Sequence, residues 1–316
     1  MARLEPLDNK LVVLVGGDGF LGTHLAQALL SQGARLRIAG RRPEKAMRLR
    51  PLANLGQLQF GRCDVKDRRS LEAVLQGADA VVYLVGTFGA DAEALQARGA
   101  GAAAEIAQAQ GATSFVYVSA LGADAQDTES RYAATKGAGE QRVRGTFPAA
   151  TIVRPSVLFG EDDRFITMFA DLVSRWSVLP VFGPNARLQP LWVDDAAQAI
   201  AHALADPAAH GGRTYELAGP EVITMEALHR RIAEGQGRNR TLLPVPDALS
   251  GLFAALPGTP MSPDQWRLLQ RGSVTTGELP GIADLGVTPR PLSLFLDRWM
   301  VRYRRHGRFG LKDAAR

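Results

Sequence analysis

The chain has 316 residues, 46% of them hydrophobic and 22% charged, an ordinary composition for a globular protein with one large domain or a large domain and a smaller lobe. Its net charge of +5 is diffuse and no RNA- or DNA-binding motif accompanies it, so we expect no nucleic-acid partner. Cys63 is the only cysteine, which excludes disulfides and a cysteine-rich metal site, and we assign no metal ligands. No apolar stretch reaches the roughly 20 residues that cross a bilayer, and residues 1–10 contain no signal-peptide core, so we expect a cytoplasmic protein.

The first predicted elements are a strand, a glycine-rich turn and a helix. Residues 11–15 form an apolar run, and Gly16, Gly19 and Gly22 follow it with G-x-x-G-x-x-G spacing. Apolar residues then recur at helical spacing, and residues 36–39 form a second apolar stretch. Glycines allow a tight turn and let the backbone approach a pyrophosphate, which lies on the positive N-terminus of the helix. The arrangement predicts the opening β-α-β of a dinucleotide-binding fold; the alternative is an ordinary β-α turn that is rich in glycine.

The end of the second predicted strand indicates which cofactor is preferred. Proteins that bind NAD usually place Asp or Glu there to hold the ribose 2′-hydroxyl. This chain has Arg41 and Arg42 instead, and a guanidinium suits a 2′-phosphate that an acid would repel. We therefore predict NADP(H) over NAD(H); the alternative is that two arginines merely solvate the end of a strand.

Strands and helices alternate through the first half of the chain. Further strands are predicted at residues 57–64, 80–85, 114–119 and 150–154, and helices at 68–76, 92–110 and 132–144. This alternation predicts an α/β fold, a Rossmann doubly wound parallel sheet. The pattern loosens after Pro155. We therefore expect residues 1–155 to form the NAD(P)-binding domain, and residues 156–316 to form a smaller C-terminal lobe over the cofactor cleft.

Three residues form a candidate catalytic set. Tyr132 and Lys136 are four residues apart, so a helix places them on one face, and Ser119 ends the fifth predicted strand, at the edge where open α/β sheets bind ligands. Tyr132 would exchange a proton with a carbonyl oxygen while hydride moves to or from a nicotinamide. Ser119 would hydrogen-bond the same oxygen, and Lys136 would hold the ribose. The alternative is that Tyr132 and Lys136 only bind the nucleotide, without turnover.

Residues 292–308 predict a basic amphipathic helix. Its apolar face would carry Leu292, Phe295, Leu296, Trp299 and Tyr303, and arginines up to Arg308 would form the adjacent face. A helix of this kind with a tryptophan can contact an anionic membrane surface or an acidic partner. The interpretation that we prefer is a final helix that packs its aromatic residues onto the smaller lobe, with its arginines in solvent.

The glycine turn together with Ser119, Tyr132 and Lys136 resembles the short-chain dehydrogenase/reductase superfamily, and the chain length resembles its extended branch. A longer resemblance, over residues 10–305, is to the NADPH-binding accessory subunit family of respiratory complex I and its bacterial homologues. Its most specific parts are RPSVLFGEDD, which begins at residue 154, and LPGIADLGV, which begins at residue 279.

This resemblance implies a tightly bound NADPH that is not turned over in the respiratory complex. It implies cofactor contacts from Gly16, Gly19, Phe20, Leu21, Gly22, Arg41, Arg42, Asp64, Val65, Val85 and Gly86. It also implies that Tyr132 and Lys136 hold the nicotinamide ribose, and that Pro155, Ser156 and Val157 lie near the nicotinamide. Asp64 would accept a hydrogen bond from the adenine amino group.

The same resemblance implies an accessory or structural role beside respiratory complex I subunits, at the cytoplasmic face of the inner membrane. The alternative is a free NADP-dependent oxidoreductase that acts on a small or apolar carbonyl, such as a quinone precursor. Ser119 and Tyr132 are 13 positions apart (132 − 119), and the extended-branch enzymes of nucleotide sugars typically have a longer separation, which argues against such a substrate. Asp194 and Asp195 are interpreted as a helix start that supports the smaller lobe.

Overall fold

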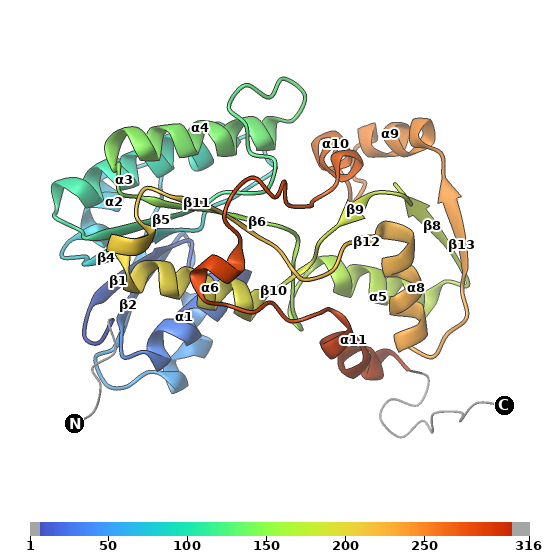
Figure 1. Ribbon diagram of the computed structural model, residues 1–316, viewed down its shortest axis with the longest axis horizontal. Helices are drawn as coiled ribbons and strands as arrows, with labels where there is room; N and C mark the ends of the chain where they lie inside the picture. The colour runs from blue at the N-terminus through green and yellow to red at the C-terminus, as the bar shows by residue number, and fades with distance from the viewer. Residues whose placement is uncertain (1–6, 305–316) are drawn as a thin grey trace. The chain divides into compact units, whose positions relative to one another are not determined.

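The computed structural model describes residues 7–304, which divide into two units (Figure 1). Unit 1 contains residues 7–155, 193–217 and 276–288, and unit 2 contains residues 156–192, 218–275 and 289–304. The chain first leaves unit 1 after Pro155, where the sequence pattern loosens. It then returns twice to unit 1, which no feature of the sequence pattern indicated.

Unit 1 is built on a seven-stranded sheet. Its strands are β1 (Leu11–Val15), β2 (Arg35–Gly40), β3 (Leu58–Arg62), β4 (Ala80–Tyr83), β5 (Ser114–Val118), β6 (Thr151–Pro155) and β11 (Thr214–Leu217). They lie in the order β11-β6-β5-β4-β1-β2-β3, and all neighbouring pairs are parallel. The predicted doubly wound parallel sheet is therefore confirmed. The direction of winding reverses beside β1, and ligands of such sheets bind at this point, outside the carboxyl ends of the strands.

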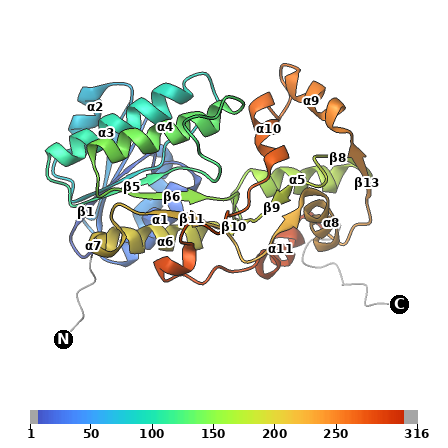
Figure 2. The ribbon, with the colours of Figure 1, turned by 45° about the horizontal axis from the view of Figure 1, so that its top comes forward.

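Helices cover both faces of this sheet because its central strands are buried on both sides; all five residues of β1 are buried. Helices α1 (Phe20–Ser31) and α6 (Val193–Ala205) pack against each other on one face (Figure 2). The other face carries α2 (Arg68–Leu75), η2 (Glu93–Arg98), α3 (Gly99–Ala109) and α4 (Arg131–Thr146). Shorter pieces complete unit 1: η1 (Pro43–Leu52), α7 (Pro207–His210) and η3 (Ile282–Leu285). The single helix predicted at residues 92–110 is thus two segments, of which η2 is a π-helix.

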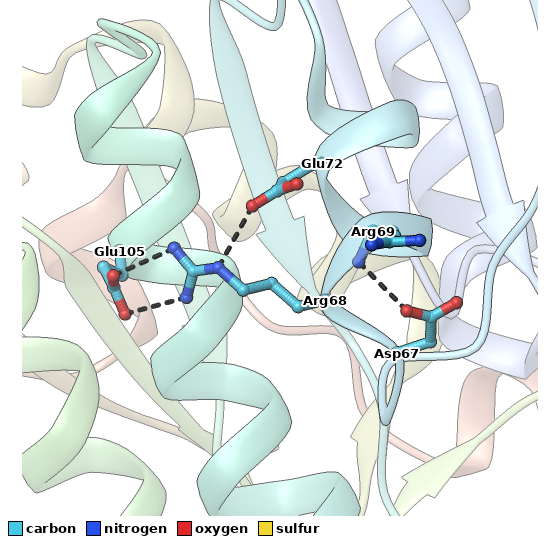
Figure 3. A network of polar contacts seen from close by, with 5 residues as sticks. All are labelled: Asp67, Arg68, Arg69, Glu72 and Glu105. Atoms are coloured by element: carbon cyan, nitrogen blue, oxygen red, sulfur yellow. Dashed lines mark hydrogen bonds and ion pairs between the residues drawn. The ribbon is translucent and has the colours of Figure 1, made fainter.

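A surface network of charges joins α2 to α3 (Figure 3). Asp67 caps α2, because its side chain accepts a hydrogen bond from Arg69 N at 3.0 Å. Arg68 donates to Glu72 one turn later and, through both terminal nitrogens, to Glu105 of α3. Its charge and hydrogen bonds lower the pKa of Glu105. The network is exposed, so we expect it to contribute little to the stability of the fold.

Unit 2, as far as the chain is described, contains three two-stranded sheets and five helices longer than one turn. Its strands are β7 (Leu158–Phe159), β8 (Val178–Phe182), β9 (Arg187–Leu188), β10 (Leu191–Trp192), β12 (Ile223–Thr224) and β13 (Thr241–Val245). Its helices are α5 (Phe165–Arg175), α8 (Met225–Gly235), α9 (Asp247–Ala255), α10 (Pro263–Arg271), α11 (Ser293–Met300) and the short η4 (Val301–Tyr303), and α8 packs against both α5 and α11. In the described part of the chain, no helix has the length and apolar character that crossing a membrane requires.

Candidate functional site

The glycine-rich turn after β1 has the backbone that a nucleotide site needs. Gly16 has a φ of 85°, which favours glycine, and its N–H donates to Ala39 O at 2.7 Å, which ties the turn to β2. A Cβ on Gly22 would lie 2.6 Å from Gly17 Cα, so only glycine lets α1 approach this closely. Gly19 precedes α1, and no described side chain caps the helix. The first N–H groups of α1 can therefore receive an anion such as a pyrophosphate.

Gly17 is a site residue that the spacing argument missed. A Cβ there would lie 2.7 Å from Leu14 Cβ, so the fourth glycine is required where the turn folds back on β1. The first two residues of α1, Phe20 and Leu21, are half-buried, and the Phe20 ring meets His24 edge-on at 5.3 Å. The predicted cofactor contacts of Phe20 and Leu21 stay predictions.

Arg41 and Arg42 follow β2 and both side chains are exposed. Neither side chain makes a hydrogen bond or ion pair with another residue of the described chain, so both guanidinium groups can bind an anion. The carboxylate of Asp18, from the glycine turn, lies at the end of β2, next to these arginines in sequence. A Cβ on Gly40, the last residue of β2, would lie 2.6 Å from Asp18 Oδ1. Asp18 carries no sequence signal of this position, because the acid that recognises a ribose normally follows the second strand.

The predicted cofactor residues Asp64, Val65, Val85 and Gly86 follow the carboxyl ends of β3 and β4. Asp64 is exposed, and its Oδ1 accepts a backbone N–H from two residues further on, at 3.0 Å. Val65 is buried. Val85 and Gly86 follow β4, and a Cβ on Gly16 would lie 3.1 Å from Val85 Cγ2, so the end of β4 borders the glycine turn. The recognition of adenine by Asp64 stays a prediction.

Lys136 is the buried cation of the site. Its side chain is almost fully buried, and Nζ donates to the carbonyls of Val118 at 2.7 Å and Val85 at 3.3 Å, at the ends of β5 and β4. Burial lowers the pKa of Lys136 from 10.5 to about 7, and the Glu140 carboxylate opposes this shift. A protonated Lys136 has a third N–H, which suits a ribose hydroxyl.

Ser119 and Tyr132 are both placed near Lys136, one through Val118 and the other on the same helix. Ser119 follows Val118 directly, is buried, and has an Oγ without a hydrogen-bond partner among the described residues. Buried hydroxyls normally have a partner, so this Oγ fits a ligand oxygen. Tyr132 is half-buried in the first turn of α4; its ring stacks on Phe88 at 4.3 Å and lies 6.0 Å from Lys136 Nζ. The geometry suits proton transfer at a carbonyl or binding of a ribose, and their catalytic roles stay predictions.

A buried glutamine on η2, Gln96, connects segments around Lys136 through hydrogen bonds, and the sequence did not predict it. The hydroxyls of Tyr83 and Tyr117 donate to two carbonyls of η2, at 2.5 and 2.9 Å. The Gln96 side chain donates to Thr135 Oγ1 at 2.8 Å and to Thr87 O at 3.2 Å. It therefore joins the loop after β4 to α4, next to Lys136. The sequence offers one weak signal for Gln96: it is the only amide side chain in the alanine-rich stretch of residues 92–104.

The segment after β6 belongs to both units. Pro155 is the last residue of β6 in unit 1, whereas Ser156 and Val157 begin unit 2. Ser156 Oγ donates to Ser273 O at 2.9 Å, and Val157 O accepts from Leu191 N at 2.9 Å. These bonds fix Ser156 and Val157 within unit 2. Their predicted position near the nicotinamide stays a prediction.

Helix α11 packs its aromatic face into unit 2, which supports the packing interpretation of this helix over a membrane contact through the same face. Trp299 is only 8% exposed, and its ring lies 5.1 Å from that of Trp192. Phe295 stacks on Trp192 at 4.0 Å, and Leu296 is buried in the same core. These side chains stabilise unit 2 and cannot insert into a bilayer at the same time. The arginines expected up to Arg308 lie partly outside the described residues, which end at residue 304.

Asp194 and Asp195 lie in the first turn of a helix, as predicted, but this helix does not belong to the smaller lobe. Both belong to α6 of unit 1. Asp194 Oδ1 lies 2.5 Å from His24 Nδ1 of α1, and Asp195 is buried. Asp194 therefore links the two helices that cover one face of the unit 1 sheet.

The chain belongs to the NAD dependent epimerase/dehydratase family, whose model matches residues 12–218. It is 32% identical to NADH dehydrogenase (ubiquinone) 1 alpha subcomplex subunit 9, mitochondrial, of Mus musculus, over 91% of this chain and 79% of that protein. It is 31% identical to ceramide reductase of Caulobacter vibrioides over 59% of this chain and 58% of that protein. The resemblance drawn from the motifs is thereby confirmed.

The fold recurs in solved structures of low sequence identity. UDP-glucose 4-epimerase of Thermus thermophilus, in complex with NAD, superposes with a TM-score of 0.70 at 18% identity, over 93% of this chain and 98% of that one. This likeness concerns the fold alone.

Proposed function

We propose that this chain binds NADP(H) and serves as an accessory subunit of respiratory complex I. The observation that carries the proposal is the extent of the likeness to the mouse subunit, which covers 91% of this chain and therefore reaches into both units. Its partners are then other subunits of that complex, at the cytoplasmic face of the inner membrane. Because the aromatic face of α11 is buried, we assign its attachment to protein partners and not to that helix.

The NADP(H) part of the proposal rests on the residues of unit 1. The glycine turn offers open backbone N–H groups to a pyrophosphate, and Arg41 and Arg42 offer guanidinium groups to a 2′-phosphate. Lys136 and Tyr132 hold the nicotinamide ribose, and the Ser119 Oγ, which has no hydrogen-bond partner among residues 7–304, is available to the ligand. When bound, the cofactor can supply hydride chemistry, but in an accessory subunit its main effect is to stabilise the folded state by binding to it.

A strain that lacks the chain tests the accessory role. We expect less assembled complex I on native gels, and restoration by the wild-type chain. The Arg68→Gln variant, a change in the exposed network between α2 and α3, should restore assembly equally and serves as the control. An unchanged amount and activity of complex I in the deletion strain would overturn the proposal.

The second candidate is a free reductase of a small or apolar carbonyl, and the complete set of Ser119, Tyr132 and Lys136 favours it. The likeness to ceramide reductase of Caulobacter vibrioides is consistent with this candidate over part of the chain. The Tyr132→Phe variant discriminates between the two. An enzyme loses turnover of quinone precursors, whereas an accessory subunit loses one hydrogen bond to its cofactor, worth about 1 kcal/mol of affinity.

A further inference from the structure

Asp18 places a carboxylate at the end of β2, where the adenosine ribose of a dinucleotide is recognised in folds of this class. A Cβ on Gly40, the last residue of β2, would lie 2.6 Å from Asp18 Oδ1 and 3.5 Å from Oδ2. The glycine turn fixes this contact, because Gly17 is packed against Leu14 and cannot move away from β1. Asp18 therefore comes from the turn before α1, yet it occupies the position usually filled by an acid that follows β2.

The charges around Asp18 are not neutralised within the protein. Asp18 is half-buried and makes no hydrogen bond or ion pair with another residue in the range 7–304. Arg41 and Arg42 follow directly after Gly40, and their exposed side chains make no hydrogen bond or ion pair within this range either. Two cations and one carboxylate are thus left for a ligand at the same strand end. A carboxylate accepts a hydrogen bond from a ribose hydroxyl, whereas it repels a phosphate of nearly two negative charges.

We infer that Asp18 is a specificity-determining residue that holds a hydroxyl of the adenosine ribose and limits the preference for NADP(H) that Arg41 and Arg42 create. The inference rests on the proposed cofactor binding. It predicts that NADPH binds more tightly than NADH, but by less than the two arginines alone would allow. Asp18 in the turn thus lowers the affinity for a 2′-phosphate, whereas Arg41 and Arg42 at the end of the strand raise it.

The Asp18→Asn variant tests this inference, because the amide keeps the size of the side chain and removes its charge. Dissociation constants for NADPH and NADH would be measured by calorimetry on the full chain after removal of bound nucleotide. We expect the ratio of NADPH affinity to NADH affinity to rise about fivefold to tenfold. Asp18→Ser should change the ratio in the same direction. Glu44→Gln removes a nearby exposed acid of η1 that does not contact Gly40, and it should change the ratio by less than twofold.

Three results would overturn the inference: an unchanged ratio in both Asp18 variants, a fall in the ratio, or an equal rise in Glu44→Gln. Each would leave the proposed cofactor binding intact, since the wild-type chain still binds nucleotide. A wild-type chain that binds neither nucleotide would instead overturn the proposed function itself.

Discussion

The Lys136 ammonium donates a 2.7 Å hydrogen bond to the backbone carbonyl of Val118. This bond ties α4 to the carboxyl end of β5, which Ser119 follows directly, and Tyr132 lies one turn earlier on the same helix. Backbone carbonyls replace only part of the water that burial removes. The ammonium that ties α4 to β5 is therefore a buried and poorly solvated charge.

The pKa of Lys136 predicts a pH dependence of stability in the nucleotide-free chain. Its pKa is about 7 in the folded state, against 10.5 for an unperturbed lysine. Below pH 7 both the folded and the unfolded state are protonated, and the cost of the buried charge is fully present. Between pH 7 and 10.5 the unfolded state binds more protons than the folded one, so the free energy of unfolding rises with pH.

Lys136→Met should lack this rise, since methionine does not titrate. Urea unfolding at several pH values between about 6 and 10 measures the free energy of unfolding as a function of pH. Lys66→Met, at an exposed lysine, is the control and should keep the wild-type dependence on pH. Parallel pH profiles of wild type and Lys136→Met would contradict the assignment.

Two glycines of α4 should respond oppositely to alanine. A Cβ on Gly139 would overlap the Tyr117 hydroxyl and the Gln96 carbonyl, so Gly139→Ala should lower the free energy of unfolding by about 1–3 kcal/mol. Gly145 has open space where its Cβ would be, so Gly145→Ala should raise it by about 0.5–1 kcal/mol through helix propensity. Chemical denaturation gives both values. Equal effects would show that α4 does not depend on close approach to η2.

The hydrogen bond between Gln96 and Thr135 should appear as an energetic coupling. Gln96→Leu and Thr135→Val each leave a buried polar group without its partner, so each should cost about 1–3 kcal/mol of unfolding free energy. The double variant should cost less than the sum of the two, because neither partner is left alone. Strict additivity in a double-mutant cycle would contradict the role of Gln96 in joining the loop after β4 to α4.

Trp299→Ala should destabilise unit 2 by about 3–5 kcal/mol, because it removes a large side chain from the core shared with Trp192. Leu294→Ala, at an exposed position of the same helix, should change stability by less than about 0.5 kcal/mol. Thermal unfolding compares the two. If Trp299→Ala kept wild-type stability and abolished membrane association, the packing account of α11 would be wrong.

Sequence patterns predicted the elements of unit 1 whose signals are local. Apolar runs placed β1 and β2, and glycine spacing placed the turn between β1 and α1. Non-local features were missed: β11 joins the sheet from beyond residue 200, and Asp18 meets Gly40 only because the turn folds back. The sequence left two interpretations of the aromatic face of α11 open, because an amphipathic pattern is the same whether it contacts a core or a bilayer. The two arginines after β2 stay exposed, so their preference for a phosphate remains a prediction.

The central claim is tested most directly by purifying a tagged chain from gently solubilised native membranes and identifying its partners by mass spectrometry. The account predicts that complex I subunits are recovered in stoichiometric amounts together with about one NADP(H) per chain. Recovery of the chain alone, without complex I subunits, would contradict the accessory role.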